Sequence, residues 1–254
     1  MALKSIIKKG IMWYSSVLHR NNKSKILYYH DIYETVNYKA LDSDIYMGTH
    51  IDVFKKHVNI IKNEGYEIVT RINRQEGQVA IMLDDGFRGI WECRNYFYEN
   101  DIYPTIFLPI EYIGDKEKGM LTKDEILELQ KHGFCFECHG WSHKPLTYCC
   151  DEELIHELQD SKKHLGSFLS KEINGICLPL GFYSHHLIEK IREYGYNDIY
   201  SSLPGNYNDN PDGMLTRNLC QHSSPEELKL ILRGGNEILR NHYQKLQEKS
   251  CDRY

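Results

Sequence analysis

Five consecutive apolar residues, 79–83, lead without a linker into Asp84, Asp85 and Gly86. An apolar run of this length that ends at a turn residue predicts a strand buried on both faces, as in a parallel sheet. A carboxylate at the tip of a buried strand is costly unless a counter-charge or a metal ion compensates it. The stretch therefore favours a metal-assisted active site, with a surface Asp-Gly turn as the alternative.

Strand and helix signals alternate along the rest of the chain. The predicted strands are 26–30, 67–72, 79–83, 105–108, 134–138, 176–178, 198–202 and 214–219. The predicted helices are 52–65, 89–100, 122–132, 151–170, 184–194 and 224–249. This order predicts an α/β fold with a mostly parallel sheet, either open or closed into a barrel. We expect one domain over residues 25–254, because no repeat or interdomain linker interrupts the pattern.

Residues 1–24 form a separate basic amphipathic segment. Lysines, an arginine and apolar residues alternate there, and residues 1–25 contain no acid. No apolar run is long enough for a secretion signal or a membrane span, which predicts a cytoplasmic protein. We expect a helix that either lies on an anionic membrane surface, as a peripheral contact, or packs on the domain.

The amino-acid composition limits the classes of molecule that we expect this protein to bind. The net charge of -5 lacks the basic footprint of a nucleic-acid-binding protein, so we expect no nucleic acid partner. Nineteen tyrosines and three tryptophans are compatible with sugar stacking and equally with ordinary packing. The eight cysteines are scattered through predicted strands and helices, which favours reduced thiols over a disulfide framework.

Two histidines four residues apart follow the strand predicted at 134–138. At this spacing His139 and His143 can reach one cation, and two imidazoles with one carboxylate are a common ligand set for a catalytic metal. The pair alone is a weak signal, but it gains weight beside the two acids at another strand tip. Isolated histidines such as His57 and His164 are predicted to be solvated helix residues.

The Asp84-Asp85-Gly86 and His139-x-x-x-His143 motifs resemble the first two motifs of the polysaccharide deacetylases, carbohydrate esterase family 4. The similarity extends from about Tyr28 to Leu232, with weaker matches at 29–31, 104–107, 178–181, 193–196 and 215–217. This resemblance implies a distorted (β/α) barrel of about seven parallel strands. It also implies one divalent metal ion and hydrolysis of an N-acetyl group on a sugar.

The resemblance assigns roles residue by residue. It implies that Asp85, His139 and His143 bind the metal and that Asp84 is the general base. Metal-bound water would attack the acetyl carbonyl, and the backbone N–H of Leu180 would donate to the oxyanion. The ligand set favours Zn²⁺, with Ni²⁺, Co²⁺, Mn²⁺ and Fe²⁺ as alternatives.

The chain departs from the family pattern in three places. Cys177 stands where the third motif begins with an arginine that orients the base, so Arg217 is a hypothetical substitute for it. No Asp-Trp motif follows Gly195, and the late Leu-x-His motif that supplies the general acid is missing. These departures leave open which residue is the general acid and which residues orient the general base.

The missing acid has a parallel in a circularly permuted branch of the family, where the histidine lies on an N-terminal strand in a Tyr-His context. Tyr28-Tyr29-His30-Asp31 resembles that pattern, which makes His30 the predicted general acid. His222 is the rival acid, and His19 lies outside the expected core.

These motifs predict a metal-dependent hydrolase that removes N-acetyl groups from an amino sugar in a polysaccharide, a glycolipid or a sugar precursor. One alternative is a catalytically silent carbohydrate-binding relative, and another is a deformylase of an amino sugar. The expected partner is an N-acetylated carbohydrate, and the sequence does not define the oligomeric state.

Overall fold

The computed structural model describes residues 2–35, 47–209 and 211–248. Helix α1 (Ala2–Leu18) precedes the first strand of the sheet. The end of the terminal helix predicted at 224–249 and Cys251 lie outside the described residues. The seven described cysteines are free thiols. Among the described residues, no helix is long and apolar enough to cross a membrane.

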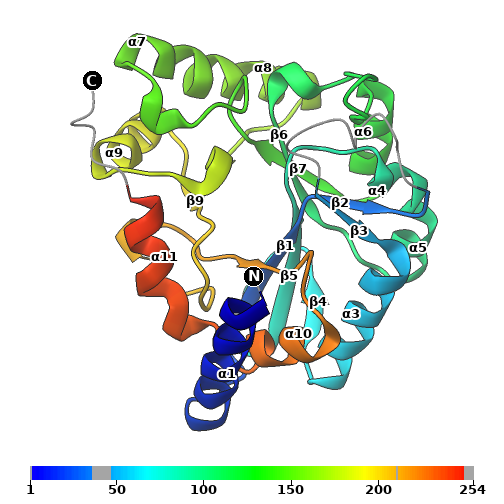
Figure 1. The fold of residues 1–254 in the computed structure, drawn as a ribbon. Coiled ribbons are helices and arrows are strands. Elements are labelled where there is room, and N and C mark those ends of the chain that lie inside the picture. Colours follow the sequence, from blue (N-terminus) through cyan, green and yellow to red (C-terminus); the bar gives the residue numbers. More distant parts are fainter. Residues whose placement is uncertain (1, 36–46, 210, 249–254) are drawn as a thin grey trace.

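A curled parallel sheet forms the centre of the molecule (Figure 1). In chain order, its strands are β1 (Lys25–Tyr29), β4 (Glu67–Val69), β5 (Gln78–Leu83), β6 (Thr105–Leu108), β7 (Cys135–Cys138), β8 (Gly175–Cys177), β9 (Asp198–Tyr200) and β10 (Asn218–Leu219). The spatial order is β10-β1-β5-β6-β7-β8-β9, and β4 pairs with β5. A parallel bridge between Tyr200 and Leu215 joins β9 to the segment that leads into β10. This arrangement confirms the predicted distorted (β/α) barrel.

Helices surround the sheet (Figure 1). They are α3 (Ile51–Asn63), α4 (Gly89–Glu92), α5 (Arg94–Glu99), α6 (Lys123–Lys131), α7 (Asp151–Leu154), a π-helical segment (Ile155–Asp160), α8 (Ser161–Leu169), α9 (His185–Glu193), α10 (Pro225–Leu232) and α11 (Arg240–Gln247). A small parallel pair, β2 (Asp31–Tyr33) and β3 (Gly48–His50), lies outside the main sheet. A capping box starts α6, where the side chains of Thr122 and Glu125 each accept a hydrogen bond from the other residue's backbone N–H.

The prediction of one long terminal helix at 224–249 is wrong. The chain instead breaks between α10, which ends at Leu232, and α11, which begins at Arg240. Gly234 has a φ of +86°, a left-handed conformation that favours glycine. A Cβ on Gly235 would lie 2.4 Å from the carbonyl oxygen of Met12, so the turn packs at backbone distance against α1. Helical periodicity extends across this pair of glycines in the sequence, but their conformation and packing interrupt the helix.

Other expected elements are shorter than predicted. The strand predicted at 214–219 is regular only at Asn218–Leu219, and the helix predicted at 89–100 divides at Cys93. The prediction of a solvated His57 is wrong. Its side chain is fully buried and bonds the Tyr29 hydroxyl through Nδ1 at 3.0 Å. His57 lies three residues after Phe54 on α3, so the two side chains share the inner face of that helix.

The N-terminal helix α1 packs on α10 and on the 3₁₀ turn Glu237–Leu239. Met12 belongs to the main hydrophobic core, and Ser15 and Ser16 are buried beside it. One side of the helix therefore packs on the domain, which is one of the two alternatives predicted for this segment. The division of the chain at residue 24 stays a prediction.

Candidate active site

The site lies at the carboxyl ends of the parallel strands, where side chains from distant segments converge. Asp84 and Asp85 follow β5, His30 follows β1, and His139 follows β7. Backbone hydrogen bonds join these ends: the N–H of Asp84 donates to Tyr29 at 3.0 Å, and that of His139 donates to Leu108 at 3.1 Å. The register of the sheet, and not sequence proximity, therefore brings the predicted residues together.

Asp85, His139 and His143 place one ligand atom each around a common point. The Oδ1 atom of Asp85 lies 3.0 Å from Nε2 of His143 and 3.4 Å from Nε2 of His139. Burial opposes ionisation of Asp85, but the close contacts with the two imidazoles outweigh it and hold its pKa below the ordinary value. Two imidazoles and one carboxylate fit a divalent cation of the zinc class.

The second ring nitrogen of His139 fixes its tautomer. Nδ1 donates to the carbonyl oxygen of Cys177 at 2.8 Å, which leaves the lone pair of Nε2 directed at Asp85. The Oδ1 atom of Asp85 is buried and accepts no hydrogen bond from the described residues. A buried carboxylate oxygen without a donor fits a bound cation, because the cation would supply the missing compensation.

The backbone of three residues at the candidate site is left-handed. The φ angles are +71° at Asp85, +77° at Gly86 and +61° at His143. A Cβ on Gly86 would lie 2.4 Å from Cδ2 of Leu108, so glycine is needed for space as well as for conformation. Non-glycine residues in this conformation are held there by their surroundings, as is common at binding sites.

Glu157 holds the loop that carries the two histidines, a role absent from the sequence predictions. Its fully buried carboxylate accepts from the N–H of Trp141 at 2.8 Å, from the N–H of Ser142 at 3.2 Å and from Oγ of Ser142 at 2.6 Å. It lies in the π-helical segment, a geometry often found at functional sites. The sequence contains no motif for it, since Glu157 is one of several acids in a predicted helix.

Arg217 forms a buried ion pair with Asp84. Its Nη1 and Nη2 atoms donate to the two carboxylate oxygens at 2.7 and 2.9 Å, and its Nε donates to the Ser201 carbonyl at 2.9 Å. Nη2 lies 2.8 Å from Sγ of Cys177. Burial opposes ionisation of Asp84, but the charge and hydrogen bonds of Arg217 outweigh it and lower the pKa of Asp84. The structure thus brings the hypothetical substitute arginine into contact with the predicted base.

The two predicted acids differ in their surroundings. His30 is half-buried, and its Nδ1 lies 2.6 Å from Oε1 of Gln221. His222 is exposed, and its Nε2 lies 3.2 Å from Nε2 of the same glutamine. Gln221 was not singled out in the sequence. The predicted oxyanion donor, Leu180, lies in the 3₁₀ turn Pro179–Gly181 after β8, with a φ of +58°.

A cleft of about 750 Å³ opens over these residues. His30, Asp84, Asp85, His139 and His143 line one part of it, together with Leu180, Arg217 and His222. Residues of α1, α10 and α11 line the other part. The volume is that of a typical small-molecule site, and the polar groups converge in the part beside the strand ends.

The sequence of residues 71–199 matches the family model described as polysaccharide deacetylase. That match covers just over half of the 254 residues. The chain belongs to the polysaccharide deacetylase family. The Bacillus subtilis (strain 168) protein YxkH, which is named as a candidate polysaccharide deacetylase, is 26% identical over 171 residues. That alignment covers 60% of this chain and 58% of YxkH, so the chain spans less than two thirds of this relative.

Solved structures of deacetylases share the fold of this family member. The Streptococcus pyogenes deacetylase PplD, in complex with acetate, has a TM-score of 0.70 at 20% identity over 83% of this chain and 98% of its own. A polysaccharide deacetylase from Bacillus cereus has a TM-score of 0.70 at 19% identity over 83% of this chain and 69% of its own. The circular permutation expected from the Tyr-His context stays a prediction.

Proposed function

We propose that this polysaccharide deacetylase family member is a metal-dependent hydrolase that removes N-acetyl groups from an amino sugar. The substrate would be a polysaccharide, a glycolipid or a sugar precursor. The observation that carries the proposal is the donor-free Oδ1 atom of Asp85, which faces two imidazole nitrogens inside a cleft. Asp85, His139 and His143 would hold one divalent ion, with Zn²⁺ favoured. Such an ion lowers the pKa of a coordinated water and polarises an acyl oxygen.

Asp84 is the proposed general base. Its carboxylate is ionised because Arg217 compensates its charge, so it can accept a proton from water beside Asp85. Arg217 is a positioning residue, since its two parallel hydrogen bonds fix the plane of the carboxylate. Cys177 contacts both groups, with Sγ 3.7 Å from Oδ2 of Asp84.

His30 is the proposed general acid. Oε1 of Gln221 faces Nδ1 of His30 and accepts its proton, so in the imidazolium form of His30 the second proton lies on Nε2. Nε2 would give that proton to the departing amine, which needs it because an amide anion is a poor leaving group, and would be left as the neutral ring. The glutamine amide is compatible with this assignment, because its Nε2 faces Sδ of Met47 as a donor. The backbone N–H of Leu180 is the proposed donor to the oxyanion, supported by the position of Leu180 on the cleft wall.

The test is acetate release from N-acetylated oligosaccharides by the metal-loaded protein, combined with elemental analysis. We expect His139→Ala to lose most of its metal and its activity. We expect Asp84→Asn to retain the metal and to lose about 10²–10⁴-fold in turnover, the usual contribution of a general base. Full metal content in His139→Ala would refute the ligand assignment.

The same experiment separates the alternatives. A catalytically silent carbohydrate-binding relative would bind the sugar without releasing acetate, with or without metal. A deformylase would release formate from N-formyl sugars and leave N-acetyl sugars intact. We favour deacetylation because the chain combines the ligand triad with a paired carboxylate beside it, which sugar binding alone does not require.

A further inference from the structure

Helix α1 presents its large apolar side chains to solvent. Seven of them have exposed fractions between 40% and 65%: Ile6, Ile7, Ile11, Trp13, Tyr14, Val17 and Leu18. Because successive residues turn by about 100° around a helix, these positions share one side. The opposite side, with Met12, Ser15 and Ser16, is buried against the protein. A helix that only completes the core would show the reverse pattern, with its largest apolar residues inward.

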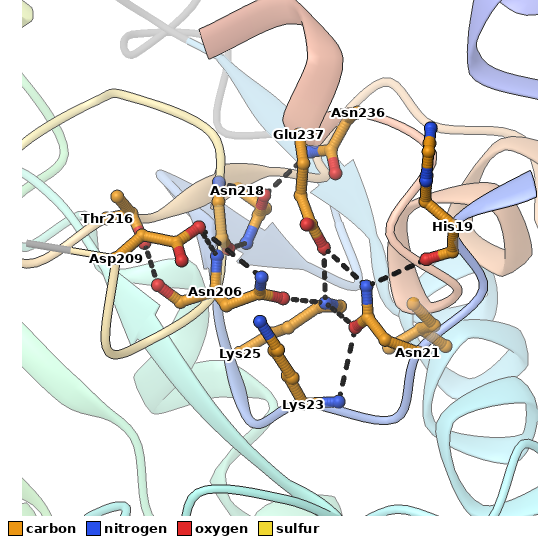
Figure 2. A network of polar contacts seen from close by, with 12 residues as sticks. His19, Asn21, Lys23, Lys25, Asn206, Asp209, Thr216, Asn218, Asn236 and Glu237 are labelled. Carbon is orange, nitrogen blue, oxygen red and sulfur yellow. Dashed lines mark hydrogen bonds and ion pairs between the residues drawn. The ribbon is translucent and has the colours of Figure 1, made fainter. Parts of the chain in front are cut away.

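The outward side is held in place by contacts on the inward side. Lys9 pairs with Glu227 of α10 at 3.5 Å. Just after the helix, Asn21 donates to Glu237 at 3.0 Å and accepts from the buried Lys25 at 3.1 Å (Figure 2). Lys25 also pairs with Glu237 at 3.1 Å. The exposure of the apolar side is therefore a consequence of how α1 is anchored, since turning the helix would break the Lys9–Glu227 pair and withdraw Met12 from the core.

The positive charge of the N-terminal segment determines the kind of surface that α1 can bind. Without the buried Lys25, residues 1–24 contain five lysines and arginines and no acid, whereas the whole chain has a net charge of -5. The outward side also carries Trp13 and Tyr14, whose rings suit the boundary between lipid headgroups and acyl chains. Two copies that met symmetrically through α1 would bring like charges together. An anionic lipid surface instead complements both the charge and the apolar side.

The same helix borders the proposed active site. Lys8 and Met12 line the cleft that contains Asp84 and His139. Two further cleft residues, Leu180 and Leu219, expose 53% and 43% of their side-chain surface. Docking through α1 would therefore place the cleft close to the lipid headgroups.

We propose that α1 docks this protein onto anionic membranes, with its apolar side inserted among the headgroups, and that the cleft receives N-acetylated sugar carried by a lipid. The docking rests on α1 alone. The substrate class rests on the function proposed above.

The test uses the full chain and phosphatidylcholine vesicles with and without phosphatidylglycerol, separated by flotation. We expect the protein to float with vesicles that contain phosphatidylglycerol, and added salt to weaken this binding. The double variant Ile7→Asp/Val17→Asp should bind at least about tenfold more weakly, because it places two charges on the inserted side. Ile155→Asp is the matched control, since it changes an exposed isoleucine near α7, far from α1 in Figure 1.

Equal thermal unfolding midpoints would show that the variants are folded, and equal acetate release from a soluble N-acetylated oligosaccharide would show that their cleft is intact. Failure of the wild type to float with either vesicle overturns the docking. A dimer that the double variant disrupts, without vesicle binding, also overturns it and assigns the face to a second copy. Vesicle binding without any acetate release leaves the docking intact and refutes the proposed function.

Discussion

Replacing Arg217 by methionine tests the buried ion pair between Arg217 and Asp84. Arg217 and Asp84 are both buried, and the guanidinium makes two hydrogen bonds to the carboxylate and one to Ser201. Methionine fills part of the space but leaves the carboxylate without its counter-charge. Removing one partner of a buried pair costs about 3–5 kcal/mol, out of a total stability of about 5–15 kcal/mol for a typical protein. We therefore expect Arg217→Met to lose a large part of its free energy of unfolding.

The matched control is Arg71→Met. Arg71 also pairs with an aspartate, Asp198, but most of its side chain is exposed to solvent. Exposed pairs contribute about 0–1 kcal/mol, so this variant should unfold close to the wild-type urea midpoint. The comparison separates the loss of a buried counter-charge from the general effect of exchanging arginine for methionine.

Urea unfolding followed by circular dichroism measures both variants, and Asp84→Asn completes a double-mutant cycle. Because Asp84→Asn removes the charge that Arg217 compensates, Arg217→Met should cost less in that background, by at least about 1 kcal/mol. A cost below about 1 kcal/mol for Arg217→Met alone, or simple additivity of the two changes, would refute the inference that Arg217 stabilises Asp84.

Three further predictions concern the loop, the acid and a surface pair. Glu157→Gln should weaken metal binding about 10–100-fold in a calorimetric titration, because the loop between the ligands loses part of its anchor; unchanged affinity would exclude this role. His30→Ala should retain metal and lose most of its turnover in the acetate assay, whereas equal losses in His222→Ala would leave the acid unassigned. Hydrogen bonds from Arg233 lower the pKa of Glu64, so the stabilisation is present at neutral pH and is lost as the pH falls through that lowered value. Glu64→Gln should thus be less stable than wild type by up to about 1 kcal/mol at pH 7. The difference in urea midpoint should disappear once the pH has fallen below that lowered pKa.

The barrel could be predicted because its strands carry a strong signal. All six residues of β5 are buried, and such a strand reads as an unbroken apolar run in the sequence. The family resemblance placed Asp85 and His139 in one ligand set, and the sheet explains why they meet, since side chains that follow parallel strands lie at one edge. Strand ends and helix breaks were less predictable, because the break after α10 depends on the packing of Gly235 against Met12, more than two hundred residues away.

Glu157 and the orientation of α1 illustrate a second limit. The spacing of apolar residues predicts both helices, but it does not show which side of each helix packs against another element. Glu157 is buried because the N–H groups of Trp141 and Ser142 face it, and those groups belong to a loop without regular structure. The apolar side of α1 would be assigned to the core by pattern alone, whereas the structure buries the side with Ser15 and Ser16.

The pairing of Arg217 with Cys177 shows how a missing motif residue can be misleading. The family places an arginine at the position of Cys177, and its absence leaves the partner of Asp84 unidentified in the sequence. In the fold, the small thiol leaves room beside Asp84, and the guanidinium of Arg217 enters that room from the segment before β10. The segment reaches it because the sheet curls until β10 lies beside β1. The positive charge beside Asp84, the proposed base, thus comes from a distant part of the chain, which the curling of the sheet brings to it.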